Sequence, residues 1–330
     1  MISHNTVCGN MVKLEEFHEF IVQEGIEKDP RDRSRIDDLL EDRKENFEDL
    51  EGARKEMFDV DRLENPFDDT KVIYGGDKDV ERFAVGVDME VQELVLLDRL
   101  NEKGRDVDGV ITHHPTGRAL AKLHEVMGLQ IDVLSEYGIP VSQAEGMVRS
   151  RSSEVKKGIH PGNHPRVPKT AELLDMALMT MHTAADNHAY SYMKDYLDEE
   201  EPDTLNDLID TILEVPEYRW SLKYGMEPQI HAGDDKNRAG KVGVLGFTGG
   251  TDLGDDIIEK MVNSGIDTLV AMHAPKGQIE KAEEKNINIV TAGHMPSDSL
   301  GINLILDKAQ QKYDIEILPM SGYKRVKRNE

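Results

Sequence analysis

The pattern of apolar and polar positions divides the chain into an acidic N-terminal segment and a core in which strands alternate with helices. In residues 11–64, apolar residues recur at steps of three or four among many charged ones, which is typical of amphipathic helices. We interpret the charged face as solvated, with a docking arm for a partner as the alternative. Residues 1–70 are therefore expected to form an acidic helical extension.

Strands and helices begin to alternate after Pro66. Apolar runs at 82–87 and 108–112 predict buried strands, and residues 90–104 between them predict a helix. One or two helices are expected next, followed by a strand at 139–143. Alternation of this kind is typical of βαβ units, which place their strands in a mostly parallel sheet.

The middle of the chain is less regular, and the alternation then returns. A proline-rich loop is expected at 156–170 and a long helix at about 171–196. Further strands, separated by helices, are expected at 241–247, 267–272, 287–293 and 314–320.

The predicted fold class is therefore α/β, with a core that spans residues 71–330. This core is expected to have two α/β halves with mostly parallel sheets, at about 71–198 and 215–330. In open parallel sheets, ligands bind in the crevice outside the carboxyl ends of the strands. A functional site is expected in such a crevice.

Composition narrows the possible partners. The chain has 65 Asp and Glu residues against 40 Lys and Arg, a net charge of −25, so nucleic acid is not an expected partner. Cys8 is the single cysteine, which excludes a disulfide within the chain and thiolate metal clusters. We expect a cytoplasmic protein, because no secretory signal begins the chain and no apolar stretch reaches the ~18 residues that span a membrane.

Polar residues with useful chemistry follow several of the expected strands. Asp88 follows the strand at 82–87, and His113 and His114 follow the strand at 108–112. His273 and His294 follow two of the later strands. Because the carboxyl ends of parallel strands line the ligand crevice, these side chains are candidates for one common site.

The adjacent histidines His113 and His114 raise a question of geometry. Neighbouring side chains within a strand point to opposite faces, but just past a strand, with Pro115 fixing the backbone, two imidazoles can converge on one site. The alternative is one core histidine and one exposed histidine. His182 and Asp186, four residues apart, share a face of the expected long helix, either as site residues or as a surface hydrogen bond.

Two further segments carry candidate chemistry. His294 ends a strand and Asp298 falls in the first turn of the next helix, where the helix dipole alone also favours a carboxylate. The glycine-rich turn GFTGGTDLG, with Thr248, Gly249 and Gly250, lies between a strand and a helix, as anion-binding loops do. This turn lacks the P-loop and GxGxxG patterns, and we consider it a possible phosphate contact.

The segments GVITHHP, HTAAD and TAGHMPSD together resemble the NGG-interacting factor three-like family, also called GTP cyclohydrolase I type 2 homologues. The likeness covers most of residues 71–320, although aspartate replaces the family's glutamate in the last motif. Residue by residue, the resemblance implies the metal ligands His113, His114, Asp186, His294 and Asp298.

The resemblance also implies two divalent metal ions per chain, in a site between two α/β domains, and a homo-oligomer in the form of a hexameric ring. Imidazoles and carboxylates suit Zn, Fe, Mn or Ni. We expect a metal-dependent hydrolase of a small polar or nucleotide-like substrate, with Asp88 or His273 handling protons. The alternative is a non-catalytic metal carrier or an oligomeric regulatory scaffold.

Overall fold

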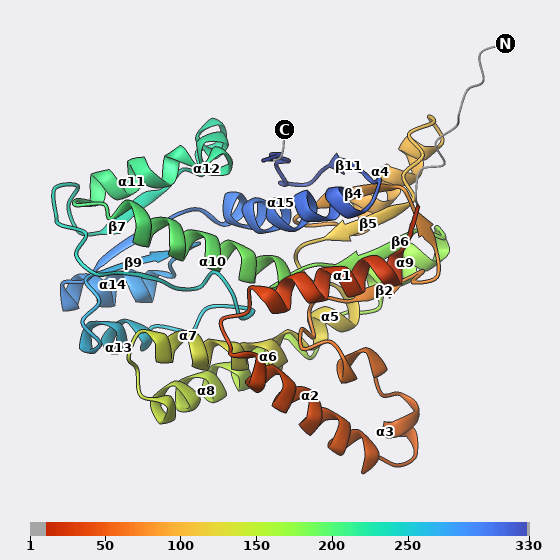
Figure 1. The fold of residues 1–330 in the computed structure, drawn as a ribbon, viewed down its shortest axis with the longest axis horizontal. Coiled ribbons are helices and arrows are strands. Elements are labelled where there is room, and N and C mark those ends of the chain that lie inside the picture. Colours follow the sequence, from red (N-terminus) through yellow and green to blue (C-terminus); the bar gives the residue numbers. More distant parts are fainter. Residues whose placement is uncertain (1–10, 329–330) are drawn as a thin grey trace.

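Two mostly parallel sheets organise residues 11–328, the part of the chain that the computed structural model describes (Figure 1). The predicted α/β class is confirmed. The five-stranded sheet has the order β11 (Glu316–Pro319), β4 (Arg82–Gly86), β5 (Gly109–Thr112), β6 (Ala177–Thr180) and β2 (Val72–Tyr74), with only β2 antiparallel. The four-stranded sheet has the order β7 (Gln229–Ala232), β10 (Asn288–Thr291), β9 (Thr268–Ala271) and β8 (Val242–Val244), with only β7 antiparallel.

Two long helices connect the cores of the two sheets. Helix α10 (Thr183–Glu200) and helix α15 (His294–Lys312) pack against each other and cross the middle of the molecule in Figure 1. In α10, Ala185 belongs to the core under the five-stranded sheet, whereas Met193 belongs to the core under the four-stranded sheet. Helix α10 therefore runs from the core of the five-stranded sheet to the core of the four-stranded sheet, and α15 packs along it.

The acidic N-terminal segment is helical from residue 14 on, as predicted, and its first helix is part of the core. Residues 1–10 of the predicted extension lie outside the described residues. Helix α1 (Leu14–Glu27) buries Phe17, whose ring stacks on Phe83 of β4 at a centroid distance of 4.7 Å. Helix α2 (Arg33–Glu48) buries only Ile36, and its other residues are polar or half-exposed. The small sheet of β1 (Val12–Lys13) and β3 (Asp79–Val80) fixes the start of this segment.

Two expectations for the segment before β6 are wrong. The strand expected at 139–143 is replaced by helix α8 (Val141–Ile159), which begins directly after Pro140. The proline-rich segment forms helix α9 (Arg166–Leu173) rather than only a loop, since Pro165 and Pro168 lie at its N-cap and first turn, where proline is tolerated. Short apolar runs do not distinguish strands from helices, which explains the first error.

The single long helix expected at about 171–196 is also wrong, because β6 interrupts it. The residues of β6, Ala-Leu-Met-Thr, are mostly good helix formers, so local propensity hides the strand. All of them are buried between β5 and β2, and this burial outweighs their preference for a helix.

The remaining elements cover the sheets and fill the ends of the molecule. They are α3 (Ala53–Glu56), η1 (Val60–Leu63), α4 (Val91–Asn101), α5 (Gly117–Ala121), α6 (Leu123–Val126), η2 (Met127–Leu129), α7 (Gln130–Glu136), α11 (Leu205–Glu214), α12 (Pro216–Ser221), η3 (Leu222–Tyr224), α13 (Ile257–Asn263) and α14 (Lys276–Lys285). Among residues 11–328, none of the helices combines the length and apolar character needed to cross a bilayer.

Candidate metal centre

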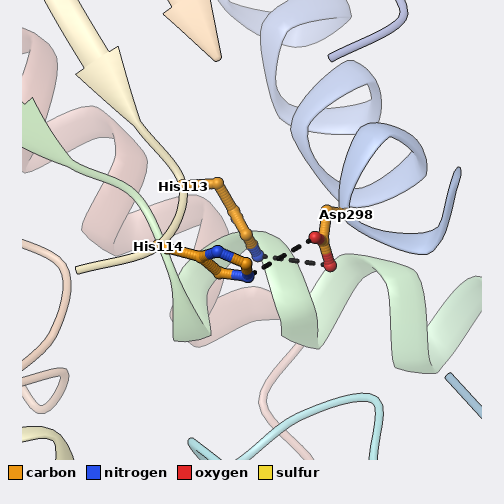
Figure 2. Close-up of side chains that lie close together, drawn as sticks. All are labelled: His113, His114 and Asp298. Carbon is orange, nitrogen blue, oxygen red and sulfur yellow. Dashed lines mark ion pairs between the residues drawn. The ribbon is translucent and has the colours of Figure 1, made fainter. Parts of the chain in front are cut away.

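The adjacent histidines leave β5 together and their rings turn toward the same site. The backbone N–H groups of His113 and His114 donate to the carbonyl oxygens of Gly86 and Val87, each across 2.9 Å, which extends the pairing of β5 with β4 by two residues. The ring centroids lie 5.5 Å apart. Figure 2 shows both rings directed toward Asp298 on α15, so neither is an exposed surface histidine.

Hydrogen bonds at Nδ1 fix the orientation of both rings. His113 Nδ1 lies 2.9 Å from the Met181 carbonyl oxygen, and His114 Nδ1 lies 2.7 Å from Oδ1 of Asp88. Because a carbonyl and a carboxylate oxygen accept hydrogen bonds, the Nδ1 atoms donate. A neutral imidazole then has its free lone pair on Nε2, which is the arrangement of metal-binding histidines.

A third histidine has the same arrangement. His182 is the N-cap residue of α10, two residues after the end of β6, and its Nδ1 donates to Oδ2 of the buried Asp69 across 2.7 Å. One turn later in α10, Asp186 Oδ2 lies 3.7 Å from His182 Nε2, and Asp186 Oδ1 lies 3.3 Å from His113 Nε2. The sequence predicted that His182 and Asp186 share a helix face, but the resemblance implied only Asp186 as a ligand, so His182 is an addition from the structure.

Helix α15 completes the cluster from the other half of the fold. Its Asp298 is fully buried, with Oδ1 3.5 Å from His113 Nε2 and Oδ2 3.6 Å from His114 Nε2 (Figure 2). His294, one turn earlier, has its Nε2 3.7 Å from Asp298 Oδ1 and 3.4 Å from His114 Nε2. The structure thus brings together the five residues that the sequence proposed as ligands.

The cluster contains buried polar atoms that nothing else in the described chain satisfies. His113 Nε2 and both carboxylate oxygens of Asp298 are buried without a hydrogen-bond partner among residues 11–328. Leaving such groups unpaired costs about 1–3 kcal/mol each. In a tetrahedral zinc site, with ligand atoms about 2.0–2.1 Å from the ion, neighbouring ligand atoms are about 3.3–3.4 Å apart. The observed separations of 3.3–3.7 Å therefore suit a bound cation.

Protonation of a histidine in the cluster also compensates the negative charge of the buried carboxylates. Burial disfavours the charged form of His113, but Asp298 and Asp186 outweigh it and raise the pKa of His113 well above 6.5. Burial likewise opposes ionisation of Asp298, but His113 and the neighbouring histidines lower the pKa of this carboxyl from 3.8 to about 2. Burial and the charge of His113 lower the pKa of His114. The site therefore holds at least one carboxylate that requires a compensating positive charge.

Two groups of residues within the cluster each have the spacing of a metal site. One consists of His113, His114 and Asp298, and the other of His113, His182 and Asp186, with all ligand atoms of a group within 4.8 Å of one another. Both groups include His113, whose Nε2 has one lone pair and can coordinate one ion. These buried His and Asp groups can hold a divalent cation.

The other residues proposed from the sequence lie around the cluster. Asp88 contacts Nδ1 of His114, and the ring of His273 stacks on that of His294 with ring centroids 5.2 Å apart. Burial and the charge of His294 lower the pKa of His273. Thr248 and Gly250 line a cavity of about 280 Å³ that opens beside the cluster, whereas the carbonyl oxygen of Gly249 accepts a hydrogen bond from Gln130.

Comparison with solved structures identifies one clearly related fold. No family model and no curated protein matches the sequence. The structure is similar to a NIF3 superfamily protein from Sphaerobacter thermophilus, with a TM-score of 0.71 and 25% identity over 79% of this chain and 93% of that one. For reduced HcgD from Methanocaldococcus jannaschii, the TM-score is 0.47 and the identity 15%, over 76% of this chain and 87% of that one. For a Bacillus cereus protein related to NIF3, the TM-score is 0.40 and the identity 10%, over 76% of this chain and 91% of that one.

Proposed function

This chain has the fold of the NIF3 superfamily, as its motifs predicted, and we propose that it is a divalent-metal-dependent hydrolase of a small molecule. One observation carries the proposal. The Nε2 atoms of His113 and His114 converge on the unpaired, buried carboxylate of Asp298 at the edge of a cavity, and His182 Nε2 faces Asp186 beside them. Each of these three histidines has its Nδ1 engaged by an acceptor. Such a site can both hold a metal and receive a ligand.

We propose two ions per chain. His114, His294 and Asp298 would hold one, and His113, His182 and Asp186 the other. This division assigns His113, which belongs to both groups, to the second ion only. When bound, a pair of divalent ions lowers the pKa of water and polarises a substrate oxygen. Histidine and aspartate ligands suit Zn, Fe, Mn or Ni.

The remaining residues orient the ligands and handle protons. Asp69 and Asp88 hold His182 and His114 in the tautomer with a free Nε2, so they act as positioning residues. His273 lines the cavity beside His294 and has no hydrogen-bond partner from the described chain. The lowered pKa of His273 leaves its imidazole neutral near pH 7, which is the form that accepts a proton from a substrate or water.

A metal carrier or scaffold is the second candidate. It is favoured by the partial exposure of two proposed ligands, since the His294 side chain is 40% exposed and that of His114 is 29% exposed. An ion held there has a short path to solvent and can exchange. Turnover and metal transfer therefore distinguish the two functions.

The test uses the full chain, stripped of metal and reloaded with Zn, Mn, Fe or Ni. Hydrolysis of a panel of small carboxylic esters, lactones and cyclic amides is compared with that of the His113→Ala/His114→Ala variant. A double variant of two loop histidines, His160→Ala/His164→Ala, is the control, because neither residue lines the cavity. The proposal expects metal-dependent hydrolysis that only the first variant abolishes. Full metal occupancy without hydrolysis, together with rapid transfer of the metal to a chelator, would support a carrier instead.

A further inference from the structure

The cavity beside the metal-ligand cluster has one polar end and a long apolar wall. The wall comes from the four-stranded sheet, the loop that follows β8 and the start of α13. It includes the side chains of Leu245, Phe247, Leu253, Ile257, Leu269 and Met272. All six are largely buried, so they belong to the packed core and form a rigid surface.

The cavity offers no cation to a charged substrate. Among the described residues, neither lysine nor arginine lines it. Asp252, which lines the cavity, accepts a hydrogen bond from Arg151 Nη2 across 2.9 Å, so this guanidinium is already paired with a carboxylate. Phosphate groups are bound in proteins mainly by arginine, lysine and helix N-termini. A nucleotide with several phosphates would therefore lack counter-charges apart from the metal ions.

The glycine-rich turn has a structural explanation that does not involve phosphate. Gln130 Nε2 donates to the carbonyl oxygens of Gly249 and Thr251, each across 2.6 Å. A Cβ at Gly249 would overlap the Gln130 side chain, and one at Gly250 would crowd Val126 and Leu123. The glycines let the turn pack closely against α6 and α7, so the sequence pattern alone does not indicate an anion site.

Other polar side chains of the lining are also engaged. Gln278 Nε2 donates to the carbonyl oxygen of Gly254, and Thr248 Oγ1 donates to Asn187 Oδ1. Unpaired polar atoms are therefore concentrated at the cluster end, around His113 and Asp298. A ligand that fills the cavity meets hydrogen-bonding groups at one end and hydrocarbon along the rest.

We propose that the substrate is a compact molecule with an uncharged apolar body, such as an aromatic ring or branched chain, and a single polar head at the metal centre. This inference rests on the proposed function and narrows its substrate class from the small polar or nucleotide-like molecule expected from the sequence. The size agrees, because an apolar cavity of about 150 Å³ already holds benzene. The cavity here, of about 280 Å³, has room for a ring and a short polar head.

The first arm of the test compares two metal-chelating hydroxamates, which differ only in a methyl or phenyl substituent, with a nucleotide. The full chain is loaded with Co²⁺, whose visible absorption reports metal uptake, and is titrated calorimetrically with acetohydroxamate, benzohydroxamate and guanosine monophosphate. We expect benzohydroxamate to bind at least ~10-fold more tightly than acetohydroxamate, because its ring buries apolar surface. Guanosine monophosphate should bind more weakly than benzohydroxamate.

The variant Ala271→Leu identifies the cavity as the source of this preference. Ala271 lies on the cavity wall at the end of β9, two residues from Leu269 on the same face of the strand, and it is not a proposed ligand. A leucine there should fill the cavity and reduce the preference for benzohydroxamate to about that of the smaller probe. Uptake of Co²⁺ with an unchanged visible spectrum shows that the variant is folded.

The second arm is independent of the metal. Fluorobenzene is added to the metal-free chain, and its ¹⁹F line width is measured with the wild type and with Ala271→Leu. Broadening that the variant abolishes supports the apolar cavity even if no metal is taken up, in which case only the proposed hydrolase fails. Equal affinities for the two hydroxamates, tighter binding of guanosine monophosphate, or no broadening by the wild type would overturn the inference.

Discussion

His182 donates a hydrogen bond from Nδ1 to the buried carboxylate of Asp69, which leaves its Nε2 facing Asp186 on the next turn of α10. Asp69 also accepts a hydrogen bond from the hydroxyl of Thr183 and is fully buried. These contacts hold the His182 ring in the orientation and tautomer that a metal ligand needs. Asp69 is therefore a positioning residue of the candidate metal centre.

Replacing Asp69 with asparagine tests this relationship. The amide removes the charge and can donate to Nδ1, which favours the tautomer with a proton on Nε2. We expect metal affinity to fall by about 10–100-fold, as for other partners of metal-binding histidines. Competition with a fluorescent chelator measures it. Asp88→Asn is the matched control, with a smaller expected loss because the Asp88 side chain is 57% exposed. Unchanged affinity in a folded Asp69→Asn variant would contradict the assignment.

Alanine substitutions at two glycines of the turn after β8 distinguish the cost of backbone strain from the cost of close packing. Gly249 and Gly254 both have positive φ, at 82° and 78°, but only Gly249 would have its Cβ in contact with a neighbour, Gln130. We expect Gly254→Ala to cost about 1 kcal/mol of unfolding free energy from strain alone. Gly249→Ala should cost about 1–3 kcal/mol more, the usual cost of overpacking. Urea unfolding of both variants measures the difference, and equal losses would contradict the packing argument.

The end of the described chain is held by a buried ion pair. Arg328 donates from both Nη atoms to Glu217 of α12, across 2.8 and 2.7 Å, and Glu217 is fully buried. Asn303 also donates to this carboxylate. The predicted cost of Arg328→Met is about 3 kcal/mol, because removing one partner leaves a buried charge.

The exposed pair of Arg219 and Glu214 provides the control for Arg328→Met. Its side chains are 57% and 73% exposed, so Arg219→Met should change the unfolding free energy by less than about 1 kcal/mol. Thermal and urea unfolding of the two variants compare them directly. Similar small losses for both would show that the Glu217 pair contributes little to stability.

Acid stability depends on the pair between Lys71 and Asp61. Lys71 Nζ is buried and lies 2.6 Å from Asp61 Oδ2 and 3.0 Å from Asp59 Oδ2. Burial alone would raise the pKa of Asp61, but Lys71 outweighs it, and the folded-state pKa lies below the ordinary 3.8. The unfolded chain therefore takes up this proton at a higher pH than the folded chain. The stabilisation is complete well above pH 3.8 and is lost as the pH falls through the folded-state value.

The corresponding variant is Asp61→Asn. At pH 7 we expect it to lower the unfolding free energy by about 1–3 kcal/mol, less than for a pair broken completely, because Asp59 remains near Lys71. Below pH 4 the difference between wild type and variant should shrink. Urea unfolding between pH 3 and pH 7 measures this, and parallel pH profiles would be the contradictory result.

The sequence predicted most of the parallel strands because apolar runs such as that of β5 are bounded by polar and glycine residues. It also predicted that His113 and His114 follow a strand, and the structure confirms this placement. The segment of β6 was misinterpreted because its residues favour a helix locally and become a strand only between two partners. Short-range propensity carries no information about such burial.

Contacts between distant segments could not be predicted. Asp69 lies 113 residues before its partner His182, and nothing in the sequence around Asp69 distinguishes it from the many other acidic residues. Likewise, β11 returns from the second half of the chain to pair with β4 of the first. Both features join segments that are far apart in the sequence, which no local pattern encodes.

The central claim is that the histidine–aspartate cluster binds metal, and metal content tests it most directly. The full chain, purified without chelator or affinity tag, is measured by mass spectrometry beside the His113→Ala/His114→Ala variant, with His160→Ala/His164→Ala as control. We predict about two equivalents of a divalent metal per chain, retained by the control and lost from the first variant. If the wild type is empty and takes up no added Zn, Mn, Fe or Ni, the cluster is not a metal site.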